Sequence, residues 1–154
     1  MPTLSPERIV VRALGGALGI AIMTTLAHAA GAPLMMVPFA TSIVLVMGSP
    51  EAQPARPRAV VAGHVLSAFA GVVCASLLGD AFWVSAIGVG AAIALMHALD
   101  AFHPPAGISP LIITSAHATP LFILSPVLTG ALILVAFAFV YHRLSGETWP
   151  ERWT

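Results

Sequence analysis

The stretch from His103 to Gly107 has the residue types and spacing best suited to binding chemistry. Pro104 and Pro105 suit the first turn of a helix, where N–H groups have no partner within the helix. Gly107 permits close approach of the backbone. Because a helix start attracts negative charge, we expect His103 and this start to bind a small anion, with Ser109 as a hydroxyl donor further along.

A second set of hydroxyl groups lies earlier in the chain, where Thr41 and Ser42 follow Pro38. This Pro-Thr-Ser arrangement is the counterpart of Pro105 and Ser109, so we expect Thr41 and Ser42 to line the same binding path. The alternative is that these hydroxyls bond to carbonyls of their own helices, as serines and threonines inside helices commonly do.

A polar stretch with three prolines runs from Ser49 to Arg58. Glu51 could pair with Arg56 or Arg58, or the arginines could collect anions at an entrance. A purely orienting role of the arginines in a membrane is equally open. Gln53, in this stretch, and His64, just beyond it, are secondary candidates for anion binding.

A metal site is the alternative use of the histidines, of which the chain has six. His97, Asp100 and His103 lie three residues apart and could form one, since imidazole binds zinc, copper and nickel. Cys74 is the only cysteine, and no acidic cluster accompanies the histidines. We therefore expect no bound metal and no cofactor. No hydrolase or phosphate-loop motif occurs, so we expect no enzymatic activity.

The elements that position these residues must lie in a membrane. The chain is 58% hydrophobic and 8% charged, whereas soluble domains carry about 25% charged residues. The net charge is zero, so the chain has no excess of positive charge with which to bind nucleic acid. The expected partners are the lipid bilayer and a small anion, and a homo-oligomer is an open question.

Six apolar segments are expected as transmembrane helices. The second and fifth segments have 16 residues each and would reach only about 24 Å as ideal helices, against roughly 30 Å of hydrocarbon. They must be short spans, broken helices or re-entrant hairpins. The six segments are Ile9–Ala30, Pro33–Gly48, Ala59–Gly79, Ala81–Leu99, Pro104–Thr119 and Leu121–His142.

The basic residues decide whether the short segments cross. All six are arginines, and they lie at the two ends of the chain and in the polar stretch around Arg56 and Arg58. Six crossings place all of these regions on one side, which agrees with the positive-inside rule. We therefore expect both termini in the cytoplasm, Asp80 and Trp83 at the outer turn, and Asp100 at the inner one.

The two halves of the chain, about 9–79 and 81–142, resemble each other. At a shift of 67 residues, Pro38 aligns with Pro105, Ser42 with Ser109, and Gly63 with Gly130. Each half contains a long, a short and a long apolar segment. Because three crossings are an odd number, the second half would enter the membrane from the opposite side, which makes the repeat inverted. Transporters with inverted repeats bind substrates near the midplane, where interrupted segments meet. The small residues in Gly15-x-x-x-Gly19 and Ser67-x-x-x-Gly71 are expected to pack helices within one molecule.

Two motifs resemble the HPP family of integral membrane proteins. The stretch from Met96 to Gly107 contains the His-Pro-Pro of that family, and the stretch from Gly48 to Arg56, followed by Gly63-His64, is similar to its other signature. The chain differs from the usual pattern at Ala55, between Pro54 and Arg56, and at Ile108-Ser109. The resemblance covers about residues 32–139. It implies a helical membrane protein whose plastid and cyanobacterial relatives are regarded as nitrite transporters. The family is often described with four spans, whereas the arginines here favour six.

Residues 1–154 are thus predicted to form a single all-α HPP-type domain in a bacterial inner membrane. Its six transmembrane segments form two inverted three-helix repeats, and it moves a small inorganic anion, nitrite first. A metal-ion transporter or sensor and a non-transporting membrane scaffold are the alternatives. The site residues predicted for the anion are His103, Pro104, Pro105, Gly107, Ser109, Thr41, Ser42, Gln53, His64 and Arg56.

Overall fold

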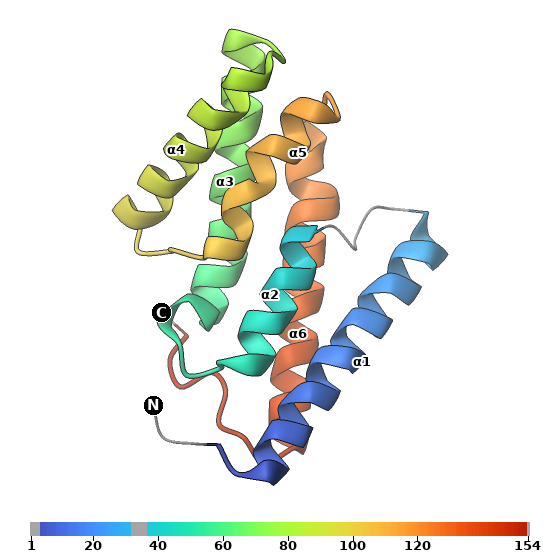
Figure 1. The fold of residues 1–154 in the computed structure, drawn as a ribbon. Helices are drawn as coiled ribbons and strands as arrows, with labels where there is room; N and C mark the ends of the chain where they lie inside the picture. Colours follow the sequence, from blue (N-terminus) through green and yellow to red (C-terminus); the bar gives the residue numbers. More distant parts are fainter. Residues whose placement is uncertain (1–3, 32–36, 154) are drawn as a thin grey trace.

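The fold is a bundle of apolar α-helices, seen in a computed structural model that describes residues 4–31 and 37–153 (Figure 1). No strand occurs within these ranges. The α-helices are α1 (Pro6–Ala30), α2 (Val37–Gly48), α3 (Pro57–Leu78), α4 (Phe82–Ala98), α5 (Ser109–Ser115) and α6 (Thr129–Leu144). Short helical turns join them: η1 (Gln53–Ala55), η2 (Pro104–Ile108), η3 (Pro120–Ile123) and η4 (Leu124–Leu128).

Prolines and glycines fix where the long helices begin and end. The Ser5 side chain accepts a hydrogen bond from the Arg8 N–H, and Pro6 follows it in the first turn of α1. Gly31 ends this helix with a φ of 58°, in the left-handed region that glycine adopts without strain. Pro57 opens α3, and Gly79, at a φ of 84°, ends it.

Three stretches are long and apolar enough to cross a membrane: Pro6–Ala30, Pro57–Leu78 and Pro120–Leu144. α2 and α4 are apolar but shorter, with 12 and 17 residues. Successive helices run in alternating directions, and both ends of the chain lie at the same end of the bundle (Figure 1). The start of the expected second segment, at Pro33, lies outside the described residues.

The fifth segment is a broken helix, one of the three alternatives expected for it, whereas the sixth differs from the expected continuous helix. The fifth begins with the five-residue 3-10 helix η2 and ends at Ser115, short of Thr119. The sixth is interrupted at Ser125, whose φ of −138° and ψ of 121° are those of extended backbone. Pro126 explains this break, because the residue before a proline is driven out of the helical region.

Glycines on α1 and α3 let neighbouring helices touch. A Cβ atom at Gly15 would lie 2.6 Å from Cε1 of Tyr141 on α6, and one at Gly19 would lie 3.0 Å from Cγ2 of Ile43 on α2. A Cβ at Gly71 of α3 would lie 2.9 Å from Cα of Pro110. The prediction that these small residues pack helices within one molecule is confirmed.

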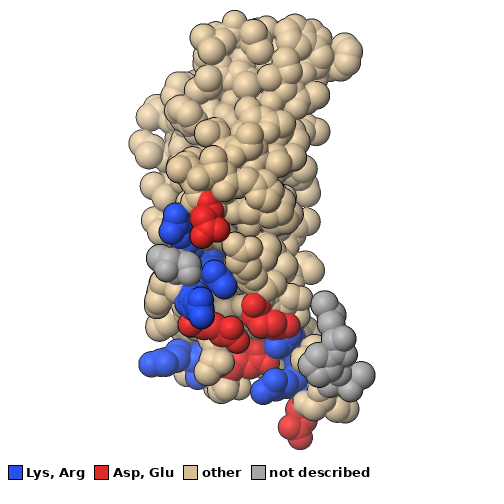
Figure 2. Space-filling model, turned by 90° about the vertical axis from the view of Figure 1, so that its left-hand side faces the viewer, with Lys and Arg blue, Asp and Glu red and all other residues tan. Residues whose placement is uncertain are grey.

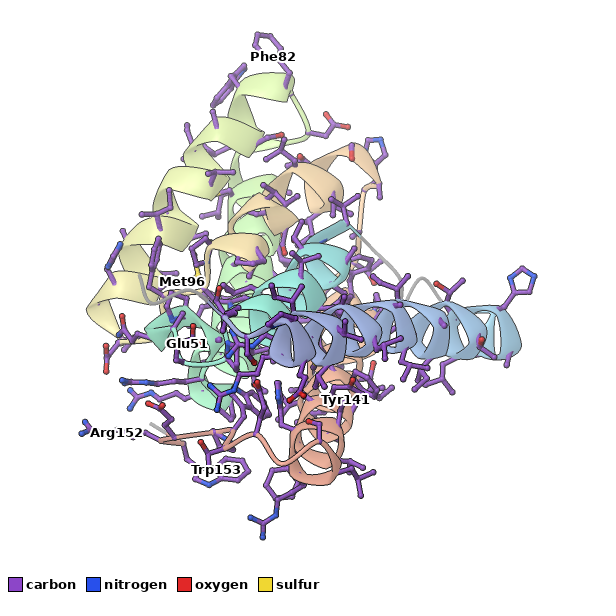
Figure 3. The ribbon with its side chains drawn as sticks, turned by 60° about the horizontal axis from the view of Figure 1, so that its bottom comes forward. Glu51, Phe82, Met96, Tyr141, Arg152 and Trp153 are labelled. Carbon is purple, nitrogen blue, oxygen red and sulfur yellow. The ribbon has the colours of Figure 1, made fainter. Side chains whose placement is uncertain are left out.

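Charged residues gather at the end of the bundle that holds the two termini. Figure 2 shows this distribution on one face, where the opposite end carries only uncharged residues. Phe82 points away from the bundle at the far tip of α4, and Glu51, Arg152 and Trp153 lie at the charged end (Figure 3). This asymmetry fits a helical bundle with one polar end in a membrane.

Glu51 forms an ion pair with Arg12, a partner that was not among those expected for it. Glu51 Oε2 lies 3.2 Å from Nη2 of Arg12, on α1. Arg12 also donates to the Gly48 carbonyl at 2.9 Å and to Glu147 at 3.3 Å. Arg58 donates instead to the Leu99 carbonyl at 2.9 Å. One arginine therefore ties α1, the α2–α3 loop and the C-terminal segment together.

Candidate functional site

A buried polar cluster centres on the hydroxyl group of Ser42, in the middle of α2. Its Oγ atom lies 2.9 Å from Nε2 of His64 and 2.7 Å from Nε2 of His103. It also donates to the Pro38 carbonyl, one helical turn earlier, at 2.7 Å. The three side chains Ser42, His64 and His103 are at most 1% exposed. We call these three residues the Ser-His-His cluster.

Each member comes from a different element. Ser42 belongs to α2, His64 to α3, and His103 to the loop between α4 and η2. Gly63 brings α3 close to this loop, because a Cβ atom there would lie 2.6 Å from Cβ of His103. The rings of His64 and His103 have their centroids 5.2 Å apart. The cluster therefore forms only when three segments pack together.

The backbone of the α2–α3 connection orients His103. Its Nδ1 atom lies 2.7 Å from the carbonyl oxygen of Pro54, in η1. Since a carbonyl only accepts, Nδ1 must carry hydrogen, and a neutral ring then has Nε2 free to accept. Burial lowers the pKa of His103 to about 4, and the hydrogen bond to Pro54 opposes this shift. The ring is therefore neutral near pH 7 in the structure as it stands.

The remaining predicted residues lie around the cluster. Thr41 bonds to the carbonyls of Val37 and Pro38 at 3.1 and 3.0 Å, which is the local bonding that the alternative expectation described. Gln53 donates to Asp100 at 3.2 Å, next to the polar end. Arg56 lies at the start of α3, close in sequence to Pro54. Ser109 is buried, and its Oγ has no hydrogen-bond partner among the described residues.

The helix start at Pro104 does not offer the free N–H groups that were expected. The prolines at 104 and 105 have no N–H, and the Ala106 N–H bonds to the His103 carbonyl at 3.0 Å. The Ala106 carbonyl accepts from Ser67 of α3 at 2.6 Å. Pro104 is exposed and Pro105 half-buried, whereas Gly107 is buried.

A groove of about 390 Å³ lies beside the cluster. Its lining is apolar apart from the hydroxyl of Thr41. Of its lining residues, Thr41 is next to Ser42 in the chain, and Pro54 accepts the hydrogen bond from His103. The groove is lined by Thr41, Leu45, Pro54, Pro104, Pro105 and Ile108. The cluster itself is closed off from it, so access to Ser42 requires a movement of α2 or η2.

The structure does not bring His97, Asp100 and His103 together as a metal site. The His97 ring stacks on Phe102 with centroids 4.1 Å apart. Asp100 faces Gln53, and His103 faces Ser42. Within residues 4–31 and 37–153, no group of three or more His, Cys, Asp or Glu side chains is placed to hold a metal ion.

Two contacts of the site were missed from sequence. The Pro54 carbonyl and the Ser67 hydroxyl hold His103 and Ala106, respectively. Ser67 was noted only as a small packing residue, and nothing in the sequence marks a particular carbonyl as a partner. The sequence feature that comes closest to marking the Pro54 contact is the position of Pro54 near Arg56 and Arg58 in the second motif.

Long apolar helices in alternating directions, a charged end and a buried polar cluster together define a polytopic helical membrane protein. Its residues 1–150 match the transmembrane region of the HPP family. The chain therefore belongs to the HPP family, and the match extends beyond the core on which the two motifs lie.

Two relatives are transmembrane proteins of Dictyostelium discoideum. One is 34% identical over 124 residues, which is 75% of this chain and 44% of the relative. The other is 32% identical over 124 residues, 75% of this chain and 40% of that relative. The matching region thus spans less than half of each relative. No solved structure matches the chain at a significant level.

Proposed function

We propose that this protein moves a small inorganic anion across a membrane, with nitrite as the first candidate. The observation that carries the proposal is the Ser-His-His cluster, buried where α2 meets η2. Polar side chains buried in a membrane domain are costly and commonly mark the path of a solute. Here they join the two short, proline-bearing segments to the long helix α3.

The chemistry of the cluster favours an anion over a cation. A hydroxyl and imidazole N–H groups are hydrogen-bond donors, and within the described part of the chain the hydrogen bonds of the three side chains involve no carboxylate oxygen. Arg56 and Arg58 lie at the polar end near η1, where positive charge would raise the local concentration of anions. Gln53 adds a neutral donor at the same end.

The arrangement of α2 and η2–α5 supports a path with two gates. α2 runs towards the charged end and α5 away from it (Figure 1), as expected of short members of two inverted repeats. The cluster would be reached alternately from either side when one short segment shifts against the other. We assign the charged end, with both termini, to the cytoplasm of a bacterial inner membrane on the basis of the arginines.

Hydrolysis is the second candidate, because a serine oxygen 2.7 Å from a histidine nitrogen is also the geometry of an activated nucleophile. We favour transport, because Ser42 Oγ also donates to the Pro38 carbonyl and is completely buried. A serine-reactive fluorophosphonate separates the two: labelling of wild-type protein, lost in Ser42→Ala, would assign hydrolysis.

Nitrite flux into liposomes tests the transport proposal. We expect reconstituted wild-type protein to admit nitrite faster than protein-free vesicles, and Ser42→Ala to reduce this flux at least about tenfold, the loss expected for about 1.4 kcal/mol of binding to the transported anion. Ser85→Ala is the matched control, because it removes a half-buried hydroxyl that bonds to Thr114, outside the cluster. Background flux in the wild type, or equal flux in wild type and Ser42→Ala, would contradict the proposal.

A further inference from the structure

The hydrogen atoms available to the Ser-His-His cluster fall one short of its contacts. Four contacts are present: from Ser42 Oγ to the Pro38 carbonyl, to His64 Nε2 and to His103 Nε2, and from His103 Nδ1 to the Pro54 carbonyl. Each needs one hydrogen between its two heavy atoms. The neutral hydroxyl and two neutral imidazoles supply three.

The missing hydrogen can be assigned to one atom. The two carbonyls only accept, so the Ser42 hydroxyl hydrogen goes to Pro38 and the Nδ1 hydrogen of His103 goes to Pro54. Both contacts that remain must be donated to Ser42 Oγ by ring nitrogens. His64 can do so as a neutral tautomer, with its hydrogen on Nε2. His103 can do so only when both of its nitrogens carry hydrogen.

A fourth hydrogen gives the cluster one positive charge, and no carboxylate of residues 4–31 and 37–153 is hydrogen-bonded to it. His64 on α3 is the titratable side chain in ring contact with His103. Asp100, at the end of α4, is bonded to Gln53, and Arg58 of α3 donates to the Leu99 carbonyl. α2 and η1 contribute Ser42 and the Pro54 carbonyl. A buried charge without a partner is strongly unfavourable.

We propose that the Ser-His-His cluster takes up one proton together with each monovalent anion, so that anion and proton move together and no net charge crosses. On loading, the proton binds to Nε2 of His103 and completes the hydrogen bonds of the cluster. The anion balances the positive charge of the imidazolium. On release, the proton leaves Nε2 for water as the anion departs. This inference rests on the proposed transport function and specifies that each transport step carries one proton with the anion.

Calorimetry with sodium nitrite tests proton uptake directly. Titrations of the purified protein in buffers with different heats of ionisation give the number of protons bound per anion, which we expect to be one. The apparent Kd should also fall about tenfold for each unit of pH decrease between about pH 8 and about pH 6. His103→Gln and Ser42→Ala should remove this pH dependence, whereas Ser85→Ala should retain it. Nitrite binding without proton uptake would overturn the inference.

Flux measurements separate this inference from the function on which it rests. Liposomes containing a pH-sensitive dye receive a nitrite gradient while potassium and valinomycin set the membrane potential. We expect protein-dependent acidification of the interior, above the leak of protein-free vesicles, and a flux that does not change with potential. Nitrite entry that follows the potential without acidification would overturn proton coupling alone. If no protein-dependent nitrite entry occurs, both transport and coupling are wrong.

Discussion

Gly63 sets the distance between α3 and the His103 loop. An added Cβ atom would lie 2.6 Å from Cβ of His103 and 3.0 Å from the Ala101 carbonyl oxygen. Neither the backbone carbonyl nor the first side-chain carbon can rotate away. The close approach of these two segments is what permits both imidazoles to reach one hydroxyl.

Gly63→Ala should therefore destabilise the protein by about 1–3 kcal/mol, as overpacking does, and reduce nitrite flux by moving His103. Thermal unfolding in detergent measures the first effect. Gly90→Ala, in α4, is the control, since no atom outside its own helix backbone and chain neighbours lies within 4 Å of the added carbon. Equal stability of the two variants would show that the contact at Gly63 is not tight.

Individual site residues could be predicted from sequence, but their contacts could not. His64 and His103 stand beside a glycine and a proline in two recognisable motifs, and Ser42 follows Pro38 by one helical turn. Their meeting depends on how α2, α3 and the His103 loop pack, which is a tertiary property. The use of Ser42 rather than Thr41 follows from helix rotation: Ser42 is buried, whereas Thr41 lines the groove.

At the scale of elements, Arg12 of α1 holds the charged end of the bundle together. Its side chain, 10% exposed, contacts the Gly48 carbonyl, Glu51 and Glu147. Glu147 is equally buried, so the loss of Arg12 leaves a carboxylate with little access to water. Tyr141 adds a bond to the Val11 carbonyl at 2.7 Å, which also joins α6 to α1.

Arg12→Met should cost about 3 kcal/mol of stability, because breaking a largely buried ion pair strands its partner. The double variant Arg12→Met/Glu147→Gln should recover part of that loss, and Arg8→Met, at an exposed position of the same helix, should be close to neutral. Unfolding midpoints in detergent provide the comparison. A double variant less stable than Arg12→Met alone would contradict this account of the cluster of charges.

Helix boundaries were predictable where proline or glycine forces them. The ends of α1 and α3 at Gly31 and Gly79 agree with the expected segments to within one residue. The break at Ser125 was missed, because Pro126 lies inside a strongly apolar run that hydropathy treats as continuous. The short length of the fifth segment did allow a broken helix, but the position of its division into η2 and α5 was not predicted.

At the scale of the whole molecule, the distribution of charge predicts how the bundle sits in the membrane. The α3–α4 turn lies at the end opposite to both termini (Figure 1). Asp80 in that turn is 64% exposed and faces His117 at 3.0 Å. Asp100 lies instead near Gln53, at the charged end.

Labelling of single cysteines in cells tests this topology. In a Cys74→Ala background, Asp80→Cys should react with a membrane-impermeant maleimide in intact cells. Asp100→Cys and Glu151→Cys should react only after permeabilisation, because we expect both on the cytoplasmic side. Labelling of positions 80 and 151 from the same side would exclude the three crossings that we propose between the α3–α4 turn and the C-terminus.

The location of a bound anion tests the central claim most directly. A structure of the protein in nitrite, determined at a resolution that shows small solutes, should contain density in contact with the side chains of the Ser-His-His cluster. Such density would place the anion where α2 meets η2. Density confined to Arg56 and Arg58 at the charged end, with the Ser-His-His cluster unchanged, would contradict a transport path through the cluster.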